Sequence, residues 1–263
     1  MTMPPAPAAK VHPPSGAAPG MTPAARATLT LAAEQKSQIL ARLAGGLFLV
    51  TFVTSIPALL LCYAHALGDP GFILGGGFDR GVSTGALLEL FLIAANVGTA
   101  LVLYPVLRKH SEVLSLGYVA ARLTENGFIA VGIVALMALN TLRLHASGAD
   151  PAMLLAAGQT LVAVHDWTFR IGPGVIVGIG NGLILGTLMW KTRLVPRAMS
   201  ILGLIGGPAV LMAGIAVLFG TIEAGSAVQA ISTVPEFLWE LSLGIWLLVK
   251  GFDRTALTEL NQT

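Results

Sequence analysis

The chain has 263 residues, of which 55% are hydrophobic and 11% are charged, and its mean hydropathy is +0.80. Soluble domains carry about 25% charged residues, so this composition excludes an ordinary water-soluble domain and favours a membrane protein. The net charge of +2 is small and the Lys and Arg residues form no basic face with interleaved aromatics, which excludes nucleic-acid binding. The single cysteine, Cys62, excludes an intrachain disulfide framework.

The first 28 residues are rich in proline and alanine, and they lack the apolar core of a signal peptide. Because proline opposes helix formation, we expect residues 1–28 to form a disordered cytosolic tail. Residues 29–42 mix polar and apolar side chains and predict a short helix at the membrane surface. The chain then divides into this tail, a membrane domain at 29–254 and a short cytosolic tail at 255–263.

Six apolar runs follow along the chain, and crossing a bilayer takes roughly 20 apolar residues. They predict an all-α integral membrane protein, a bundle of six transmembrane helices with the lipid bilayer as its partner. Pro57 predicts a kink in the first run, and Gly206-Gly207-Pro208 is expected to interrupt the fifth. The runs lie at about 43–66, 82–107, 113–140, 175–190, 198–219 and 228–249.

An extra helix is expected between the third and fourth spans. Asp150-Pro151 is a favourable pair for the cap and first turn of a helix, which would run to about Arg170 along the outer surface. Gly172-Pro173-Gly174 should bend or break the chain after it. The fourth run is short, so it spans the bilayer only if the preceding helix contributes a turn.

The basic residues predict the orientation, because cytosolic loops are enriched in Lys and Arg. Eleven of the 15 Lys and Arg residues lie before the first span or after the second, fourth and sixth spans. Only Arg80 and Arg143 lie in the opposite loops. We therefore expect a multi-pass protein of the cytoplasmic membrane with both termini in the cytosol.

Polar side chains inside the third span are the main candidates for function. Arg122, Glu125 and Asn126 fall on one helical face (i, i+3, i+4), and such groups are costly in lipid unless they are compensated. Counted from the cytosolic ends, polar residues of other spans lie at the same depth, roughly 15–20 Å into a core about 30 Å thick. The predicted buried polar site consists of Arg122, Glu125, Asn126, Glu236, Glu240, Asn96 and Asn181.

Within this site we expect Arg122 to pair with Glu240, with the other residues around the pair. Three carboxylates at the level of one guanidinium could form the site of a proton-linked carrier of a small solute. The same residues could form a static polar clasp in a non-transporting sensor or partner subunit. Both readings stay open, and an intramembrane enzyme is a distant third.

Other chemistry finds little support in the sequence. His65, His145 and His165 lie at outer ends near four aspartates, but no two of these histidines have ligand spacing such as i, i+4, so no metal site is predicted. The HExxH motif is absent, and Gly81-Val82-Ser83-Thr84-Gly85 lacks the full nucleophile-elbow pattern. No catalytic residue and no cofactor is therefore predicted, and neither a ligand nor an oligomeric state follows from the sequence.

Several short motifs, taken in order, resemble a known family. These are Arg42-Leu43-Ala44-Gly45-Gly46-Leu47-Phe48-Leu49-Val50-Thr51, Leu103-Tyr104-Pro105-Val106-Leu107-Arg108, Arg122 with Glu125, Leu194-Val195-Pro196-Arg197 with Leu202-Gly203, Glu240, and Trp246-Leu247-Leu248-Val249-Lys250-Gly251-Phe252. In this order the chain is similar to the bacterial integral-membrane family called domain of unknown function 4386, over about residues 39–252. The resemblance implies a multi-helix membrane protein and supplies no activity or ligand.

Overall fold

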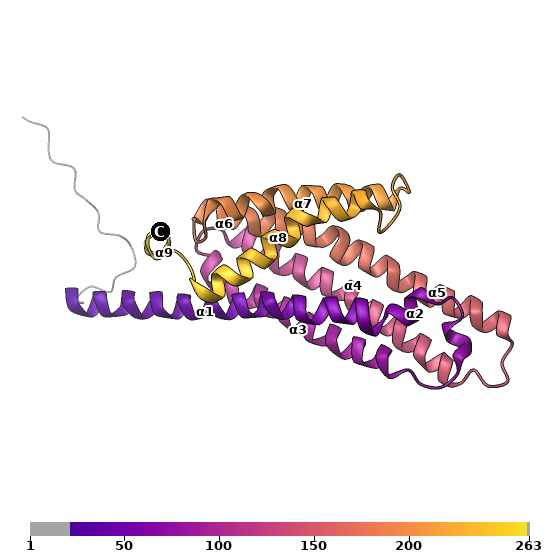
Figure 1. Ribbon diagram of the computed structural model, residues 1–263. Coiled ribbons are helices and arrows are strands. Elements are labelled where there is room, and N and C mark those ends of the chain that lie inside the picture. The colour runs from indigo at the N-terminus through magenta and orange to yellow at the C-terminus, as the bar shows by residue number, and fades with distance from the viewer. Residues whose placement is uncertain (1–21, 262–263) are drawn as a thin grey trace, which may run out of the picture.

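The computed structural model describes residues 22–261, and this part of the chain is helical throughout, with short connections and no strand (Figure 1). Four of the segments are π- or 3-10-helical rather than α-helical and carry the label η. The elements are α1 (Pro23–Pro57), η1 (Ala58–Cys62), α2 (Ala64–Gly68), η2 (Phe72–Gly75), α3 (Arg80–Leu107), α4 (Glu112–Leu144), α5 (Pro151–Ile171), η3 (Gly172–Ile176), η4 (Gly178–Leu185), α6 (Gly186–Thr192), α7 (Arg197–Leu218), α8 (Ala227–Val249) and α9 (Arg254–Leu260).

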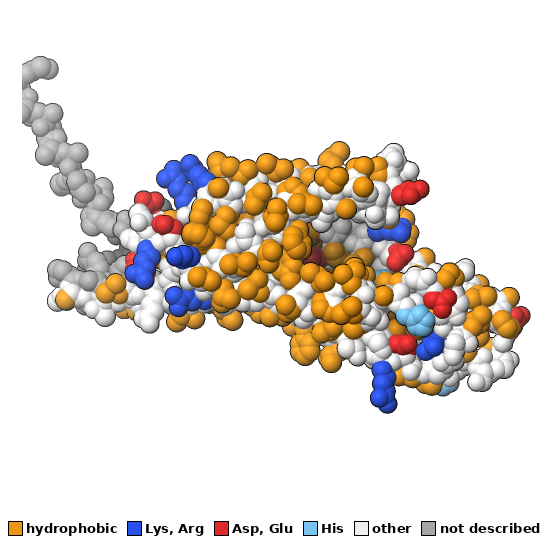
Figure 2. Space-filling view, viewed as in Figure 1, with side chains coloured by type: hydrophobic (Ala, Val, Ile, Leu, Met, Phe, Trp, Pro, Cys, Tyr) orange, Lys and Arg blue, Asp and Glu red, His pale blue; other side chains and the backbone are white. Residues whose placement is uncertain are grey.

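Six helical segments of the described chain are long and apolar enough to cross a membrane, by length and composition. They correspond to the six predicted runs, and they indicate a multi-pass membrane protein. Figure 2 shows a broad band of hydrophobic side chains around the middle of the molecule, with charged side chains gathered at its two ends. An apolar belt of this kind matches the hydrocarbon core of a bilayer.

The fourth span differs from the prediction. Residues Pro151–Thr192 form one helical run of 42 residues, in which α5 continues through η3 and η4 into α6. The expected separate surface helix is not confirmed, because α5 is the first half of this span and packs along α4. Gly172-Pro173-Gly174 does not break the run, since the chain there widens into a π-helix. The expected capping pair is confirmed: Pro151 is the first helical residue, and the Asp150 side chain accepts from the backbone N–H of Ala152 at 2.8 Å.

The two chain ends also differ from expectation. α1 begins at Pro23, so residues 23–28 are helical, whereas the sequence predicts a non-helical tail up to residue 28; residues 1–21 lie outside the described part of the chain. Proline is tolerated here because the first helical position needs no N–H partner. The predicted short tail after 254 contains α9, whose Leu257 and Leu260 are buried against the bundle.

The spans form a closed ring. α1 packs on α3, α3 on α4, α4 on the π-helical part of the fourth span, that part on α7, α7 on α8, and α8 back on α1. Both described chain ends lie at the same end of this ring, which we call the termini end (Figure 1). A large apolar cluster around Trp239, Leu243 and Leu107 fills the bundle towards the termini end, and a second cluster around Tyr63 and Leu136 fills it towards the opposite end. Between these two clusters the ring encloses several polar side chains from different spans.

Small residues allow the fourth and fifth spans to approach closely. A Cβ built at Gly207 of α7 would lie 2.6 Å from the carbonyl oxygen of Gly178 and 2.8 Å from Cα of Gly182, both in η4. The predicted interruption at Gly206-Gly207-Pro208 is wrong, because α7 runs without a break through Pro208. These glycines serve instead as the contact surface of a continuous helix, as is common in membrane bundles.

This contact gives a first prediction. Gly207→Ala should lower the free energy of unfolding by about 1–3 kcal/mol, because the added methyl group meets backbone atoms that cannot move aside. Gly127→Ala is the matched control, since Gly127 is an exposed helical glycine with open space at its Cβ position. Thermal unfolding of both variants in lipid nanodiscs would measure the difference. Equal midpoints for the two variants would contradict the close contact.

Candidate functional site

A pocket of about 320 Å³ lies inside the ring, and α1, α3, α4, α7, α8 and the fourth span all contribute to its wall. Five of the seven predicted polar residues line it, and the remaining two, Asn126 and Asn181, are buried and hydrogen-bonded to that group. The polar lining residues are Thr51, Ser55, Asn96, Arg122, Glu125, Thr233, Glu236 and Glu240. The sequence therefore predicted most of the polar wall of this pocket.

Arg122 is the central cation of the site and is 2% exposed. Its Nη1 donates to Oε2 of Glu125 at 2.8 Å, one turn along the same helix, and its Nε donates to the Tyr118 hydroxyl at 3.3 Å. Its Nη2 lies 4.0 Å from Oε1 of Glu240 on α8. The expected pair with Glu240 is thus present as a longer contact, and the direct hydrogen bond goes to Glu125 instead.

Two asparagines join the second span to the third. Asn96 of α3 donates its Nδ2–H to Oδ1 of Asn126 at 3.1 Å, and Asn126 donates its own amide to the carbonyl oxygen of Arg122 at 2.8 Å. Both asparagines are buried, and such bonds satisfy amides that would be costly alone in lipid. They join α3 to the turn of α4 that carries Arg122.

The fourth span reaches the site through its π-helical part. Asn181 of η4 is fully buried, and its Nδ2 donates to Oε1 of Glu240. The backbone carbonyl of Asn181 accepts a hydrogen bond from the Trp239 indole at 3.1 Å. π-helical turns are rare and occur frequently at functional sites, since they alter which backbone groups are free. Here the turn fixes Glu240 between Asn181 and Arg122.

Glu236 stands apart from the other carboxylates. It lines the pocket and is 3% exposed, yet neither of its carboxylate oxygens has a hydrogen-bond partner within residues 22–261. Oε2 lies against the backbone of two glycines, since a Cβ would come within 2.8 Å of it at Gly206 and within 2.7 Å at Gly182. The glycine contact between α7 and η4 therefore also makes room for a carboxyl group without a partner, and such groups are uncommon in folded proteins.

The site contains more acidic than basic groups. Within the pocket, one guanidinium faces the three carboxyl groups of Glu125, Glu236 and Glu240. Arg122 directs its contacts to Glu125, Tyr118 and Glu240, so it offers no hydrogen bond to Glu236. Chemically, this arrangement can accept a proton or a cation, and it opposes an anion.

Two tyrosine contacts were missed at the sequence level. Tyr118 lies four residues before Arg122, on the same helical face, and this spacing was the available signal. Glu89 is buried towards the opposite end and accepts a hydrogen bond from the Tyr63 hydroxyl at 2.9 Å. Because Tyr63 comes from a different span, no local pattern marks it as the partner of Glu89.

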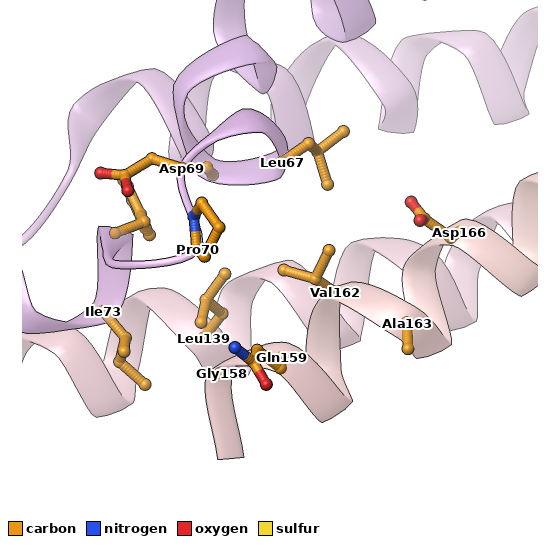
Figure 3. A pocket seen from close by; sticks show the side chains of 12 residues that line it. Leu67, Asp69, Pro70, Ile73, Leu139, Gly158, Gln159, Val162, Ala163 and Asp166 are labelled. Carbon is orange, nitrogen blue, oxygen red and sulfur yellow. The ribbon is translucent and has the colours of Figure 1, made fainter. Parts of the chain in front are cut away.

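A second pocket, of about 240 Å³, lies nearer the opposite end, between η2 and α5 (Figure 3). Its wall is mostly apolar, with Asp69 and Asp166 on different segments and Gln159 between them. His65 lies 3.7 Å from Asp69, while His165 is buried against Tyr63 and Phe169. Among the described residues, no three His, Cys, Asp or Glu side chains are grouped so that they could hold a metal ion.

The comparison with protein families agrees with this architecture. The family model described as "Domain of unknown function (DUF4386)" matches residues 43–251, and the chain belongs to this family. The matched region includes all six spans from the middle of α1 onward and every residue of the pocket. No curated protein and no solved structure shows a significant match to the chain.

The geometry of Arg122 gives a second prediction. Arg122→Gln should lower the free energy of unfolding by about 3–5 kcal/mol, because it leaves buried carboxylates without a cation. In double-mutant cycles, Glu125→Gln should show a larger coupling energy with Arg122→Gln than Glu240→Gln does, since only Glu125 is directly hydrogen-bonded. Equilibrium unfolding of the variants in mixed micelles measures these free energies of unfolding and coupling energies. A larger coupling for Glu240 would show that the pair across the helices dominates.

The lining of the pocket gives a third prediction, in a background where Cys62, the only cysteine, is changed to Ala. Ser55 lines the pocket, whereas its neighbour Thr54 is buried outside it and bonds the Val50 carbonyl at 2.8 Å. In nanodiscs, Ser55→Cys should react at least about ten times faster than Thr54→Cys with a charged methanethiosulfonate, because thiolates form only where water reaches. Equally slow reaction would indicate a dry pocket.

Proposed function

We propose that this protein is a proton-linked carrier of a small solute and that the pocket around Arg122 is its substrate and proton site. The observation that carries the proposal is Glu236, a carboxyl group without a partner in the same pocket as an engaged guanidinium. A purely structural polar layer would be expected to satisfy every buried group. A carrier needs at least one group that gains and loses a hydrogen-bond or ion-pair partner during the transport cycle.

The excess of carboxyl groups over the one guanidinium in the pocket supports a role for protons. Burying more carboxylates than the guanidinium balances costs free energy, and a proton on one carboxyl group removes that cost. Glu236 and Glu240 are one helical turn apart on α8, so a proton or a cation can satisfy either of them without a large movement. Release of the proton would then leave a negative site that favours a new cation or proton.

Irregular helices next to the pocket support a moving site. η1 follows Pro57, and η3 begins at Gly172-Pro173, so two of the spans have π-helical turns beside the pocket residues Ile56 and Pro173. Interrupted helices near the substrate are a recurring feature of secondary transporters. Because π-helical turns can shift their hydrogen bonds, they provide places where α1 and the fourth span can bend.

We further propose that the termini end faces the cytosol in the cytoplasmic membrane. The helix ends and connections at this end contain most of the Lys and Arg residues, and Lys109 there contacts Asn261 at 2.7 Å. Loops with this bias are usually retained on the cytosolic side. The opposite end, with Asp69, Asp150 and Asp166, would then face outward.

A second candidate is a non-transporting sensor or partner subunit in which the polar layer holds the helices together. The hydrogen bonds of Asn126 favour this second candidate, because they join α3 to α4 and give both the amide oxygen and the amide nitrogen a partner. In this case the pocket would stay dry, and replacing its carboxyl groups would change stability alone.

The fourth prediction separates the two candidates. Proteoliposomes with an entrapped pH-sensitive dye are exposed to amines, amino acids, sugars and carboxylic acids in turn. The proposal predicts that one class drives proton movement and that Glu240→Gln abolishes it while the thermal midpoint is retained. Glu112→Gln, at the exposed first turn of α4, is the matched control and should transport normally. Absence of proton movement with every class, together with a lower midpoint for Glu240→Gln, would favour the structural role.

A further inference from the structure

The pocket has the composition of a site for a cation. Its one guanidinium is already bonded within the protein, and Glu236 presents two carboxylate oxygens that accept no hydrogen bond from any described residue. The group that the pocket lacks is therefore a positively charged hydrogen-bond donor. An anionic ligand would face three carboxyl groups and one engaged cation, which opposes its binding.

Most of the remaining wall is apolar and aromatic. Phe52 of α1 and Phe237 of α8 meet edge to face, with their ring centroids 5.2 Å apart, and Phe169 contributes a third ring from the fourth span. Aromatic rings attract cations through their faces, and they also provide contact area for an apolar body. At about 320 Å³, the pocket lies at the lower end of the size range of small-molecule sites.

The mouth of the pocket opens within the apolar band of the molecule. Figure 2 shows a hollow between α1 and α8 in the middle of this band, with an acidic side chain at its floor. Several side chains along this side of α1, η1 and α8 are exposed and apolar, including Ile56, Leu59 and Phe237. A ligand that is itself partly apolar can therefore reach the carboxyl groups from the lipid side.

We infer that the ligand of this pocket is a small amphipathic organic cation, an ammonium group on an apolar body, whose charged end binds Glu236 and Glu240 and whose apolar end contacts the phenylalanines. This inference rests on the proposed carrier function of the same site. Arg122 and Glu125 pair with each other within α4, which leaves the two carboxyl groups of α8 as the variable part of the site.

The test uses three probes of similar shape, namely 2-phenylethylammonium, 2-phenylethanol and 3-phenylpropanoate, with the full chain in lipid nanodiscs. Equilibrium binding of the labelled ammonium probe should be saturable and at least about tenfold tighter than that of the alcohol, and the carboxylate should not compete. Glu236→Gln should weaken binding of the ammonium probe at least about tenfold. Glu89→Gln is the matched control, because Glu89 is an equally buried carboxyl group that bonds Tyr63 outside this pocket.

Several outcomes would overturn the inference: no saturable binding of the ammonium probe, equal binding of the alcohol, tighter binding of the carboxylate, or unchanged binding by folded Glu236→Gln. If Glu236→Gln fails to fold, the comparison of the three probes on the native chain still decides. The two proposals fail separately. Binding of the ammonium probe without proton movement would overturn the carrier and keep the cation site, whereas proton-linked flux of sugars or acids would do the reverse.

Discussion

The buried guanidinium of Arg122 is the constraint on which the rest of the bundle depends. A permanent cation inside an apolar ring must have counter-charges and acceptors, and it has them in Glu125, Tyr118 and, at longer range, Glu240. Glu125 and Tyr118 lie on α4 itself, and Glu240 reaches the guanidinium from α8 across the ring. The closed order of the spans, with α8 returning to α1, makes that approach possible.

The site also contains more carboxyl groups than Arg122 needs as counter-charges, and a purely structural site would not need this excess. One carboxyl group on α4 is sufficient to pair the guanidinium, yet α8 adds two more, and Glu236 has no donor in the part of the chain that the structure describes. The glycines of α7 and η4 give Glu236 its space, so close helix packing and an unpaired acid occur at the same place. Packing and chemistry are therefore coupled, and a change in the contact between α7 and η4 would directly change the surroundings of Glu236.

Much of this could be predicted from the sequence, because hydropathy locates spans and because charges in lipid must meet one another. The seven predicted polar residues do gather in and around one pocket. The predicted pair of Arg122 with Glu240 is present only as a 4.0 Å contact, because the distance to Glu240 depends on how α8 packs, whereas helical spacing alone brings Glu125 into reach. The fourth span was predicted as too short because Gly172-Pro173-Gly174 normally ends a helix, and a π-helical turn carries the chain through it. Tyr63 and Glu89 pair across spans, which no local pattern encodes.

The central claim is that groups from separate spans meet in one water-reachable pocket inside the bundle. An experimental structure in lipid nanodiscs, at a resolution that shows ordered water, tests it most directly. The account predicts Arg122 bonded to Glu125, with Glu240 within reach of both Arg122 and Asn181, and with water or a ligand beside Glu236. Carboxyl groups of Glu236 and Glu240 that face lipid, or that are separated from Arg122 by packed apolar side chains, would contradict it.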